Sequence, residues 1–178
     1  MIGRRGITQA AFNTKEMREL TSVDNLQTYM VQSEVNDSMT DASRTEALER
    51  AYMRRNDFLA EKFTQIESAE QYEDIMSRKN EKKLILRFLR SPTELIADPI
   101  TNRISGVTLQ KMALEGAPRK QRAVEASSDD EAFLRDFKCD VLIKSIGYRS
   151  QRLLGVPFDE KKCVIPHEYG CVQDPVTK

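Results

Sequence analysis

The segment that decides the fold is Met1-Ile-Gly-Arg-Arg-Gly-Ile-Thr-Gln-Ala-Ala-Phe-Asn-Thr-Lys-Glu16, at the start of the chain. Its pattern predicts the end of a strand, a cationic turn and the start of a helix. Gly3 and Gly6 bracket Arg4 and Arg5, and glycine lets the backbone turn sharply where a strand ends. We therefore expect both guanidinium groups to project from the carboxyl edge of a sheet, where open α/β sheets bind ligands.

Two adjacent arginines at such an edge suit a phosphate group. Arginine stays charged and presents a planar fork of donors, so it forms bidentate, charge-assisted hydrogen bonds to phosphate oxygens. NADP carries a dianionic 2′-phosphate, which requires positive charge where an NAD site places a carboxylate. The pair Arg4 and Arg5 therefore has two interpretations, a clamp for a 2′-phosphate or two solvated surface arginines.

A short helix is expected directly after the arginine turn. Asn13 is followed three residues later by Glu16, which is the spacing of a helix N-cap and its capping-box partner. The pattern predicts a helix from Thr14 to about Ser22.

Composition indicates ordinary globular structure without an excess of either charge. The 178 residues are 39% hydrophobic and 31% charged, enough for one core. The 28 basic residues balance 28 acidic ones, which argues against a bulk nucleic-acid binder. No apolar run approaches the ~18 residues that span a membrane, and the first residues lack the apolar stretch of a signal peptide.

The cysteines and the histidine predict no metal site. Cys139, Cys163 and Cys171 are an odd number without a CxxC pair, so we expect free thiols in a reducing compartment. His167 is the only histidine and has no acidic or cysteine cluster near it in sequence. We interpret it as a surface or structural residue.

Downstream of the first helix, the pattern predicts one loop and two further helices. Polar residues fill Thr21 to Thr40, which is expected to be a loop. Ser43-Arg-Thr-Glu46 matches a capping box, and apolar residues at helical spacing from Leu48 to Ile66 predict the longest helix, roughly Ser43 to Glu67. Ser68 to Lys83 is expected to be a second helix.

The remaining pattern predicts mainly strands. The expected extended segments are Leu84 to Arg90, Glu94 to Ala97, Ile104 to Leu114 and Cys139 to Ser145. Gly116 to Asp130 is poor in apolar anchors and is expected to be a flexible hairpin loop. Periodicity alone predicts an α/β or α+β fold.

Eight segments match one known family, and the first three match it in spacing as well as in letters. They are Gly3-Arg4-Arg5-Gly6, Ala11-Phe12, Lys15 to Leu20, Leu86 to Pro92, Ile104 to Leu109, Leu142 to Ser150, Val156 to Asp159 and Val164 to Pro166. In these segments the chain resembles adrenodoxin reductase, the mitochondrial-type ferredoxin-NADP reductase family. The resemblance touches most of the chain except Thr21 to Lys83.

The resemblance implies an α/β fold: an incomplete dinucleotide-binding, glutathione-reductase-like NADP domain with an antiparallel strand flap and a long helix. In this family an FAD domain is interrupted by an NADP domain. Residues 1–145 are expected to be part of the NADP domain, and residues 146–178 the start of the returning FAD-domain segment. The glycine-rich phosphate loops of the family are not present and the chain has no Trp, so we expect an internal piece whose last segment is poorly packed or laid against the rest.

The resemblance also assigns the nucleotide-binding residues. Arg4 and Arg5 correspond to the arginines that hold the NADP 2′-phosphate. Glu16 has two compatible interpretations. It caps the helix, or it turns toward the ribose of the cofactor and orients an arginine, as the matching residue does in the family.

Three further arginines are candidates for binding a protein partner. Arg18 lies in a firmly matched stretch and corresponds to a partner-binding arginine of the family. Arg50 and Arg54, one helical turn apart, lie in the region where the resemblance implies docking of an acidic ferredoxin. The alternative for all three is a solvated helix surface on which unlike charges pair at i,i+4.

The function that the resemblance implies is electron transfer from NADPH through FAD to a ferredoxin or adrenodoxin-like iron-sulfur protein in mitochondria. The chain is expected to hold the 2′-phosphate clamp, to lack the FAD site and any catalytic residue, and to be inactive alone. Two alternatives stay open. One is a non-catalytic module that binds ferredoxin, and the other is an unrelated helical scaffold with a chance Gly-Arg-Arg-Gly sequence.

Overall fold

A computed structural model describes residues 1–127 and 135–173 of the chain. The chain divides into two compact units, Met1–Val141 and Leu142–Lys178, each described by itself. The first unit combines parallel and antiparallel strands with helices, so its fold is mixed α/β. Within the described ranges, no helix is long and apolar enough to cross a membrane.

A small parallel sheet forms the centre of the first unit. Its strands are β1 (Leu26–Val31), β2 (Thr64–Ile66) and β3 (Lys82–Leu86), in the order β2-β1-β3. The start of the chain extends this sheet, because Ile2 forms a parallel bridge with Arg87 just past the end of β3. The arginine turn therefore follows a segment that runs parallel to the sheet.

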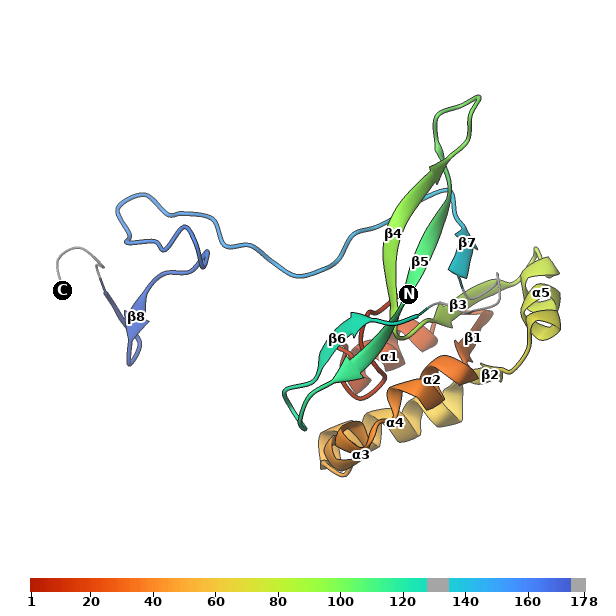
Figure 1. Cartoon of the computed structure of the whole chain (residues 1–178), viewed down its shortest axis with the longest axis horizontal. Coiled ribbons are helices and arrows are strands. Elements are labelled where there is room, and N and C mark those ends of the chain that lie inside the picture. The colour runs from red at the N-terminus through yellow and green to blue at the C-terminus, as the bar shows by residue number, and fades with distance from the viewer. Residues whose placement is uncertain (128–134, 174–178) are drawn as a thin grey trace. The chain divides into compact units, whose positions relative to one another are not determined.

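Helices cover both faces of the parallel sheet (Figure 1). They are α1 (Thr14–Thr21), α2 (Gln32–Ser38), α3 (Asp41–Ala47), α4 (Arg50–Lys62) and α5 (Ala69–Ser77). Strand β1 shows why both faces are covered, since successive side chains point to opposite sides of a strand. Met30 packs in a cluster with Phe58 and Leu59 of α4. Tyr29 and Val31 pack in a second cluster with α5.

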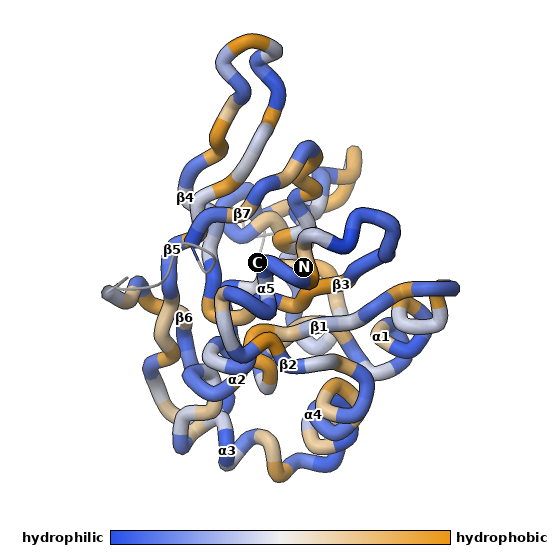
Figure 2. The backbone as a smooth tube through the Cα atoms, turned by 90° about the vertical axis from the view of Figure 1, so that its right-hand side faces the viewer, coloured by the Kyte–Doolittle hydropathy of each residue, from blue (hydrophilic) through white to orange (hydrophobic). Residues whose placement is uncertain are grey.

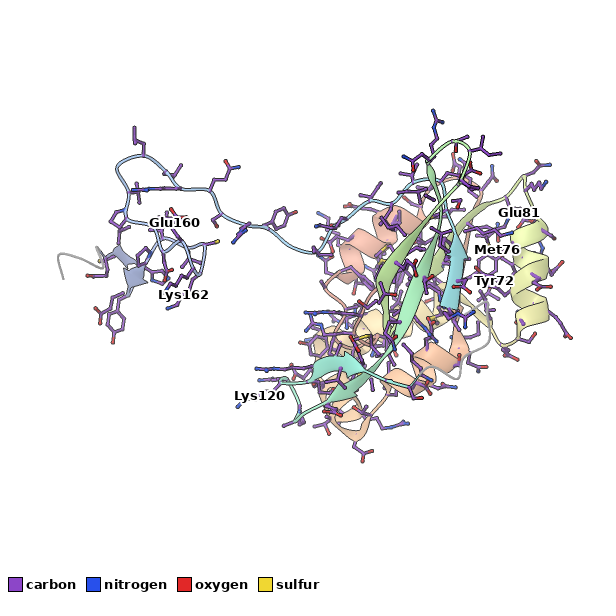
Figure 3. The ribbon with its side chains drawn as sticks, turned by 45° about the horizontal axis from the view of Figure 1, so that its top comes forward. Tyr72, Met76, Glu81, Lys120, Glu160 and Lys162 are labelled. Carbon is purple, nitrogen blue, oxygen red and sulfur yellow. The ribbon has the colours of Figure 1, made fainter. Side chains whose placement is uncertain are left out.

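Helix α5 contributes one buried side and one exposed side. Tyr72 is buried and points from α5 toward the strands, and Met76, one helical turn further along the same face, is 39% exposed (Figure 3). Ser68 caps this helix by accepting a hydrogen bond from the Gln71 backbone N–H. Apolar burial against β1 therefore fixes α5 on its face of the sheet.

The antiparallel flap is built around one long strand. Strand β5 (Ile104–Glu115) pairs with β4 (Arg90–Ala97), β6 (Arg122–Glu125) and β7 (Asp136–Lys138), all antiparallel. The β4–β5 hairpin extends away from the helices, and apolar residues lie at its tip (Figure 2). Ile100, in the turn, is 91% exposed.

The prediction of a loop from Thr21 to Thr40 is wrong, because this segment contains β1 and α2. Only three successive residues of β1, Tyr29 to Val31, are buried. This run is too short to stand out among the surrounding polar residues. Helix α2 leaves no apolar periodicity in the sequence because its buried residues, Glu34 and Ser38, are polar.

The prediction of one helix from Ser43 to Glu67 is also wrong. The chain forms α3 and α4, interrupted at Leu48 and Glu49, and then β2. The N-cap of α3 is Thr40 rather than Ser43, since the Thr40 side chain accepts a hydrogen bond from the Ser43 backbone N–H at 3.1 Å. Leu48, read as a core residue of the long helix, is 79% exposed at this break.

The predicted second helix is shorter than expected, because α5 ends at Ser77 and the lysines near its predicted end belong to β3. The predicted strand from Leu84 to Arg90 is divided between β3 and β4. Leu89, between the two strands, has a φ of 53° and so turns the chain.

The strand predicted from Ile104 to Leu114 is confirmed as β5. The strand predicted from Cys139 to Ser145 is not formed, and the chain pairs earlier, at β7. Val141 and Ile143 are 73% and 84% exposed, so this apolar run has no partner strand here to bury it. The predicted loop from Gly116 to Asp130 contains β6, and its last three residues lie outside the described residues.

The second unit contains little regular structure in its described residues, 142–173. Its strands β8 (His167–Glu168) and β9 (Cys171–Val172) form a two-residue hairpin ladder, and Asp159 and Val164 form one isolated bridge. Leu154 and Tyr169 are fully exposed. The expectation that the final segment is poorly packed or laid against the rest of the chain remains a prediction. The assignment of the two segments to an NADP and an FAD domain remains a prediction.

Candidate functional site

The arginine turn lies at the carboxyl end of the parallel sheet. The Gly3 N–H donates to the Arg87 carbonyl at 2.9 Å, and the Arg90 N–H donates to the Gly3 carbonyl at 3.1 Å. Arg4 and Arg5 follow immediately and are exposed. The Leu89 N–H then donates to the Arg5 carbonyl at 3.3 Å. Backbone hydrogen bonds thus fix the turn while both guanidinium groups face solvent.

The two glycines of the turn have different roles. A Cβ on Gly6 would lie 2.6 Å from Cβ of Ser38, so Gly6 is required for close packing against the end of α2. A Cβ on Gly3 would meet nothing closer than 3.9 Å. Only Gly6 therefore needs to be glycine for steric reasons.

The capping box of α1 is confirmed. The Glu16 N–H donates to Oδ1 of Asn13 at 2.9 Å, and Oε2 of Glu16 accepts from the Asn13 N–H at 2.8 Å. Glu16 is exposed and carries negative charge in the first turn of the helix, where the helix dipole favours an anion. One of its two compatible interpretations, capping, is therefore seen directly.

The three candidate partner-binding arginines do not all line the same groove. Arg18 and Arg54 line one groove of about 1060 Å³ between α1 and α4, together with Lys15, Asp57 and other residues of both helices. The Arg18 guanidinium lies 5.6 Å from the centre of the Phe58 ring. Arg50 is exposed at the start of α4 and is not among the residues that line this groove.

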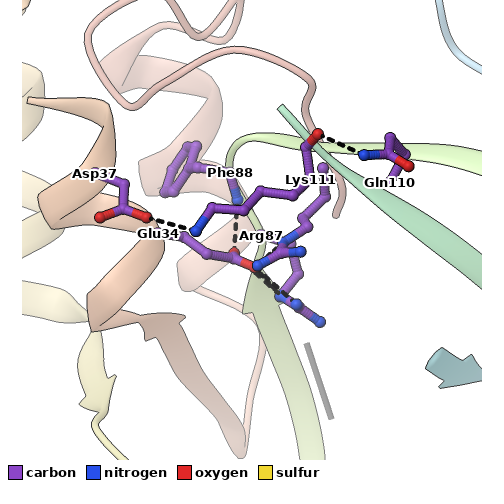
Figure 4. Close-up of polar contacts among 7 residues, drawn as sticks. Glu34, Asp37, Arg87, Phe88, Gln110 and Lys111 are labelled. Atoms are coloured by element: carbon purple, nitrogen blue, oxygen red, sulfur yellow. Dashed lines mark hydrogen bonds and ion pairs between the residues drawn. The ribbon is translucent and has the colours of Figure 1, made fainter. Parts of the chain in front are cut away.

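A buried ion cluster lies beside the arginine turn and was not foreseen from the sequence. Oε1 of Glu34 accepts from Nη2 of Arg87 and from Nε of Arg90, both at 2.7 Å (Figure 4). Oε2 accepts from the Phe88 N–H at 2.9 Å. The side chains of Glu34, Arg87 and Arg90 are at most 2% exposed. Glu34 thus joins α2 to the segment that pairs with Gly3.

A second unforeseen residue is Arg55 on α4. In the sequence it is one charged residue among many within the predicted helix from Ser43 to Glu67. It is 5% exposed, and its guanidinium donates to backbone carbonyls of the loop between the arginine turn and α1. Burial lowers the pKa of Arg55 from its ordinary value, and the nearby Tyr52 opposes this. Arginine nevertheless stays protonated in proteins.

Comparison with known proteins gives consistent matches along nearly the whole chain. No protein-family model matches it. The mitochondrial NADPH:adrenodoxin oxidoreductase of Arabidopsis thaliana is 32% identical over 174 residues, which are 97% of this chain and 34% of that protein. The chain is homologous to a segment of the adrenodoxin reductase family. The human mitochondrial member is 30% identical over 175 residues, again 34% of its length.

Solved structures of the adrenodoxin reductase family support the fold. Mycobacterium tuberculosis FprA in complex with NADPH aligns with a TM-score of 0.71 over 96% of this chain and 33% of FprA, at 23% sequence identity. The Mycobacterium tuberculosis relative named NADPH-ferredoxin reductase FprA is 27% identical to this chain over 170 residues. The chain thus spans about a third of the length of the relatives it matches.

Proposed function

We propose that this chain is the 2′-phosphate-binding segment of a reductase that passes electrons from NADPH through FAD to a ferredoxin. One observation carries the proposal. Two exposed arginines, Arg4 and Arg5, stand at the carboxyl end of a parallel sheet, next to a capped helix, in a chain homologous to NADPH-dependent reductases. Binding sites in open α/β sheets occupy this edge.

The arginines fit the chemistry of the NADP 2′-phosphate. Each offers a planar, charged donor fork, and both side chains face solvent where a nucleotide can reach them. Glu16, which starts the neighbouring helix, is the candidate for contact with the ribose and for orienting an arginine. The flavin would supply the hydride and single-electron chemistry. We assign that site to the rest of the reductase, so the chain alone should be colourless and inactive.

The candidate partner is an acidic ferredoxin or adrenodoxin-like protein. Arg18 and Arg54 line one groove and Arg50 lies exposed on the same helix as Arg54, so together they offer positive charge to an acidic surface. Opposite charges at an interface mainly accelerate association and give it salt dependence.

The proposed location is mitochondrial, in the matrix or associated with the inner membrane. The plant, rat and human relatives are named as mitochondrial proteins, which supports the compartment.

A restored reductase, in which this chain replaces the aligned third of the Arabidopsis relative, tests the proposed function. We expect a yellow protein that oxidises NADPH and reduces ferredoxin, measured as ferredoxin-dependent reduction of cytochrome c. A protein that holds flavin but is not reduced by NADPH would contradict the proposal. If the isolated chain binds ferredoxin and the restored protein stays inactive, a non-catalytic binding module is the better account.

The hypothesis of an unrelated helical scaffold loses its support. The absence of a parallel segment leading into Gly3 would have favoured that hypothesis, whereas Ile2 pairs in parallel with Arg87.

Charge reversal at Arg18 should weaken the partner interaction. In the restored reductase, Arg18→Glu is expected to raise the KM for ferredoxin about tenfold at low salt, because an attraction of roughly 1.4 kcal/mol or more is lost. The KM for NADPH should stay within about twofold, since this groove is not the proposed nucleotide site. Arg44→Glu, at an exposed position on α3, is the matched control. Equal effects of the two reversals would mean that only net charge matters.

A further inference from the structure

The side chain of Arg55 fills a hollow lined by backbone carbonyls. Its Nη2 donates to the carbonyl oxygens of Ile7 at 2.9 Å and Thr8 at 2.5 Å. Its Nη1 donates to those of Ala10 at 2.8 Å and Phe12 at 3.3 Å. One guanidinium on α4 thus binds four carbonyls of a single loop.

The surroundings of this guanidinium are suited to a cation. It lies 5.3 Å from the centre of the Tyr52 ring and 5.7 Å from that of Phe12, within the range of cation–π attraction. The four carbonyls point their negative ends at one place, and buried carbonyls without a donor are costly. The loop shape therefore depends on a planar cation with several donors at this place.

The loop joins the two parts of the proposed nucleotide site. Arg4 and Arg5 directly precede Gly6, and Asn13, which caps α1, directly follows Phe12. A second contact also holds this loop, because Nε2 of Gln9 donates a hydrogen bond to Oε1 of Gln121 at 3.0 Å. The place of the arginines relative to Glu16 is thus set by how this loop is held.

We propose that Arg55 is a positioning residue for 2′-phosphate recognition: by filling the carbonyl hollow of the loop from Ile7 to Phe12, it fixes Arg4 and Arg5 relative to Glu16. This rests on the proposed function. Arg55 would touch no nucleotide. Its effect is to hold the loop in the binding conformation before the nucleotide arrives. Less conformational entropy is then lost on binding, and the affinity for the 2′-phosphate is higher.

The hollow has a property that makes the inference testable. Arg55, Tyr52 and Phe12 all line the groove between α1 and α4. If Arg55 is shortened to alanine, the carbonyl hollow opens toward this groove, and free guanidinium ion can enter it. A small cation of the right shape should therefore replace the missing side chain.

The experiment compares the wild-type chain with Arg55→Ala, Arg55→Lys and the exposed control Arg44→Ala. Binding of adenosine 2′,5′-bisphosphate and of 5′-AMP is measured by NMR titration, and the ratio of the two affinities reports 2′-phosphate recognition. Hydrogen exchange at the Gln9 and Ala10 amides, which donate to the Gly6 and Ile7 carbonyls, reports loop order without any nucleotide. Each measurement is repeated with guanidinium chloride at about 50 mM, which is far below the concentrations that unfold proteins. Urea and sodium chloride at the same concentration serve as controls.

We expect Arg55→Ala to reduce the affinity ratio by about tenfold or more, equivalent to ~1.4 kcal/mol, and to speed exchange at both amides. Guanidinium should restore both readouts, whereas urea and sodium chloride should not. Arg55→Lys should restore them only in part, because an ammonium group cannot span four carbonyls. Arg44→Ala should behave as wild type.

Other outcomes separate the two claims. If the wild-type chain does not prefer the bisphosphate, the proposed function fails, and the exchange data alone decide the role of Arg55 in the loop. If Arg55→Ala keeps the wild-type ratio and exchange rates, the inference is wrong. If both Arg55 variants lose the near-UV circular dichroism of the whole chain and guanidinium does not recover it, Arg55 supports the entire fold, which also overturns the inference.

Discussion

Replacing Arg4 and Arg5 together by alanine in the restored reductase is expected to weaken NADPH binding by at least about 100-fold. Each arginine contributes charge-assisted hydrogen bonds to the 2′-phosphate, worth roughly 1.5–3 kcal/mol apiece. NADH has no such phosphate and should lose little affinity. The preference for NADPH over NADH should therefore collapse, measured as the ratio of the two kcat/KM values.

Two control measurements test whether the lost affinity comes from the 2′-phosphate contact rather than from damage to the fold. Flavin content and ferredoxin reduction by chemically reduced flavin should be unchanged, because both arginines are exposed and only their turn's backbone is hydrogen-bonded to the sheet. Equal weakening of NADPH and NADH would contradict the assignment. It would mean that the arginines hold the pyrophosphate or the fold.

Neutralising Glu34 should have the largest effect on stability. Glu34→Gln removes the negative charge shared by Arg87 and Arg90 in a site where all three side chains are buried. Removing one partner of a buried ion cluster costs about 3–5 kcal/mol, and domains are stable by only about 5–15 kcal/mol. Urea unfolding of the chain, followed by far-UV circular dichroism, should show a much lower midpoint or no folded baseline.

Asp37→Asn is the matched control, because Asp37 lies on the same helix and pairs with Lys111 at 3.2 Å in a partly exposed position (Figure 4). Exposed pairs contribute about 0–1 kcal/mol, so this change should be small. If Glu34→Gln costs no more than Asp37→Asn, the cluster does not hold α2 to the arginine turn.

Local signals in the sequence predicted local structure well. The capping box of Asn13 and Glu16 was predictable because cap and partner are three residues apart and satisfy each other's backbone N–H groups. The strand from Ile104 was predictable because its alternating apolar residues, such as Val107 and Leu109, are buried. Such patterns need no knowledge of the rest of the chain.

Long-range polar contacts could not be predicted in this way. Arg55 binds carbonyls about 45 positions away, at Ala10 and Ile7, and nothing near it in sequence marks it as buried. Glu34 and Arg87 form a hydrogen-bonded ion pair although they are 53 positions apart in the sequence. In a single sequence, a buried charge with distant partners is indistinguishable from a solvated one, because the pattern records polarity and not pairing.

Breaks in regular structure were the other source of error. The helix from Ser43 was predicted through Leu48 and Glu49 because apolar spacing continues across them. The chain breaks there, and Glu49 instead forms an ion pair with Arg119, at 2.7 Å, from the turn before β6. Helical preference is weak at each residue, so apolar spacing that continues across a position does not by itself keep the helix intact there.

The most direct test of the central claim is to follow the side-chain Nε–H signals of Arg4 and Arg5 by NMR while nucleotides are added to the chain. We predict that adenosine 2′,5′-bisphosphate shifts both signals, and that 5′-AMP, which lacks the 2′-phosphate, leaves them in place. The account would be contradicted if both nucleotides produced the same shifts, or if the bisphosphate moved the signals of other arginines and not these two.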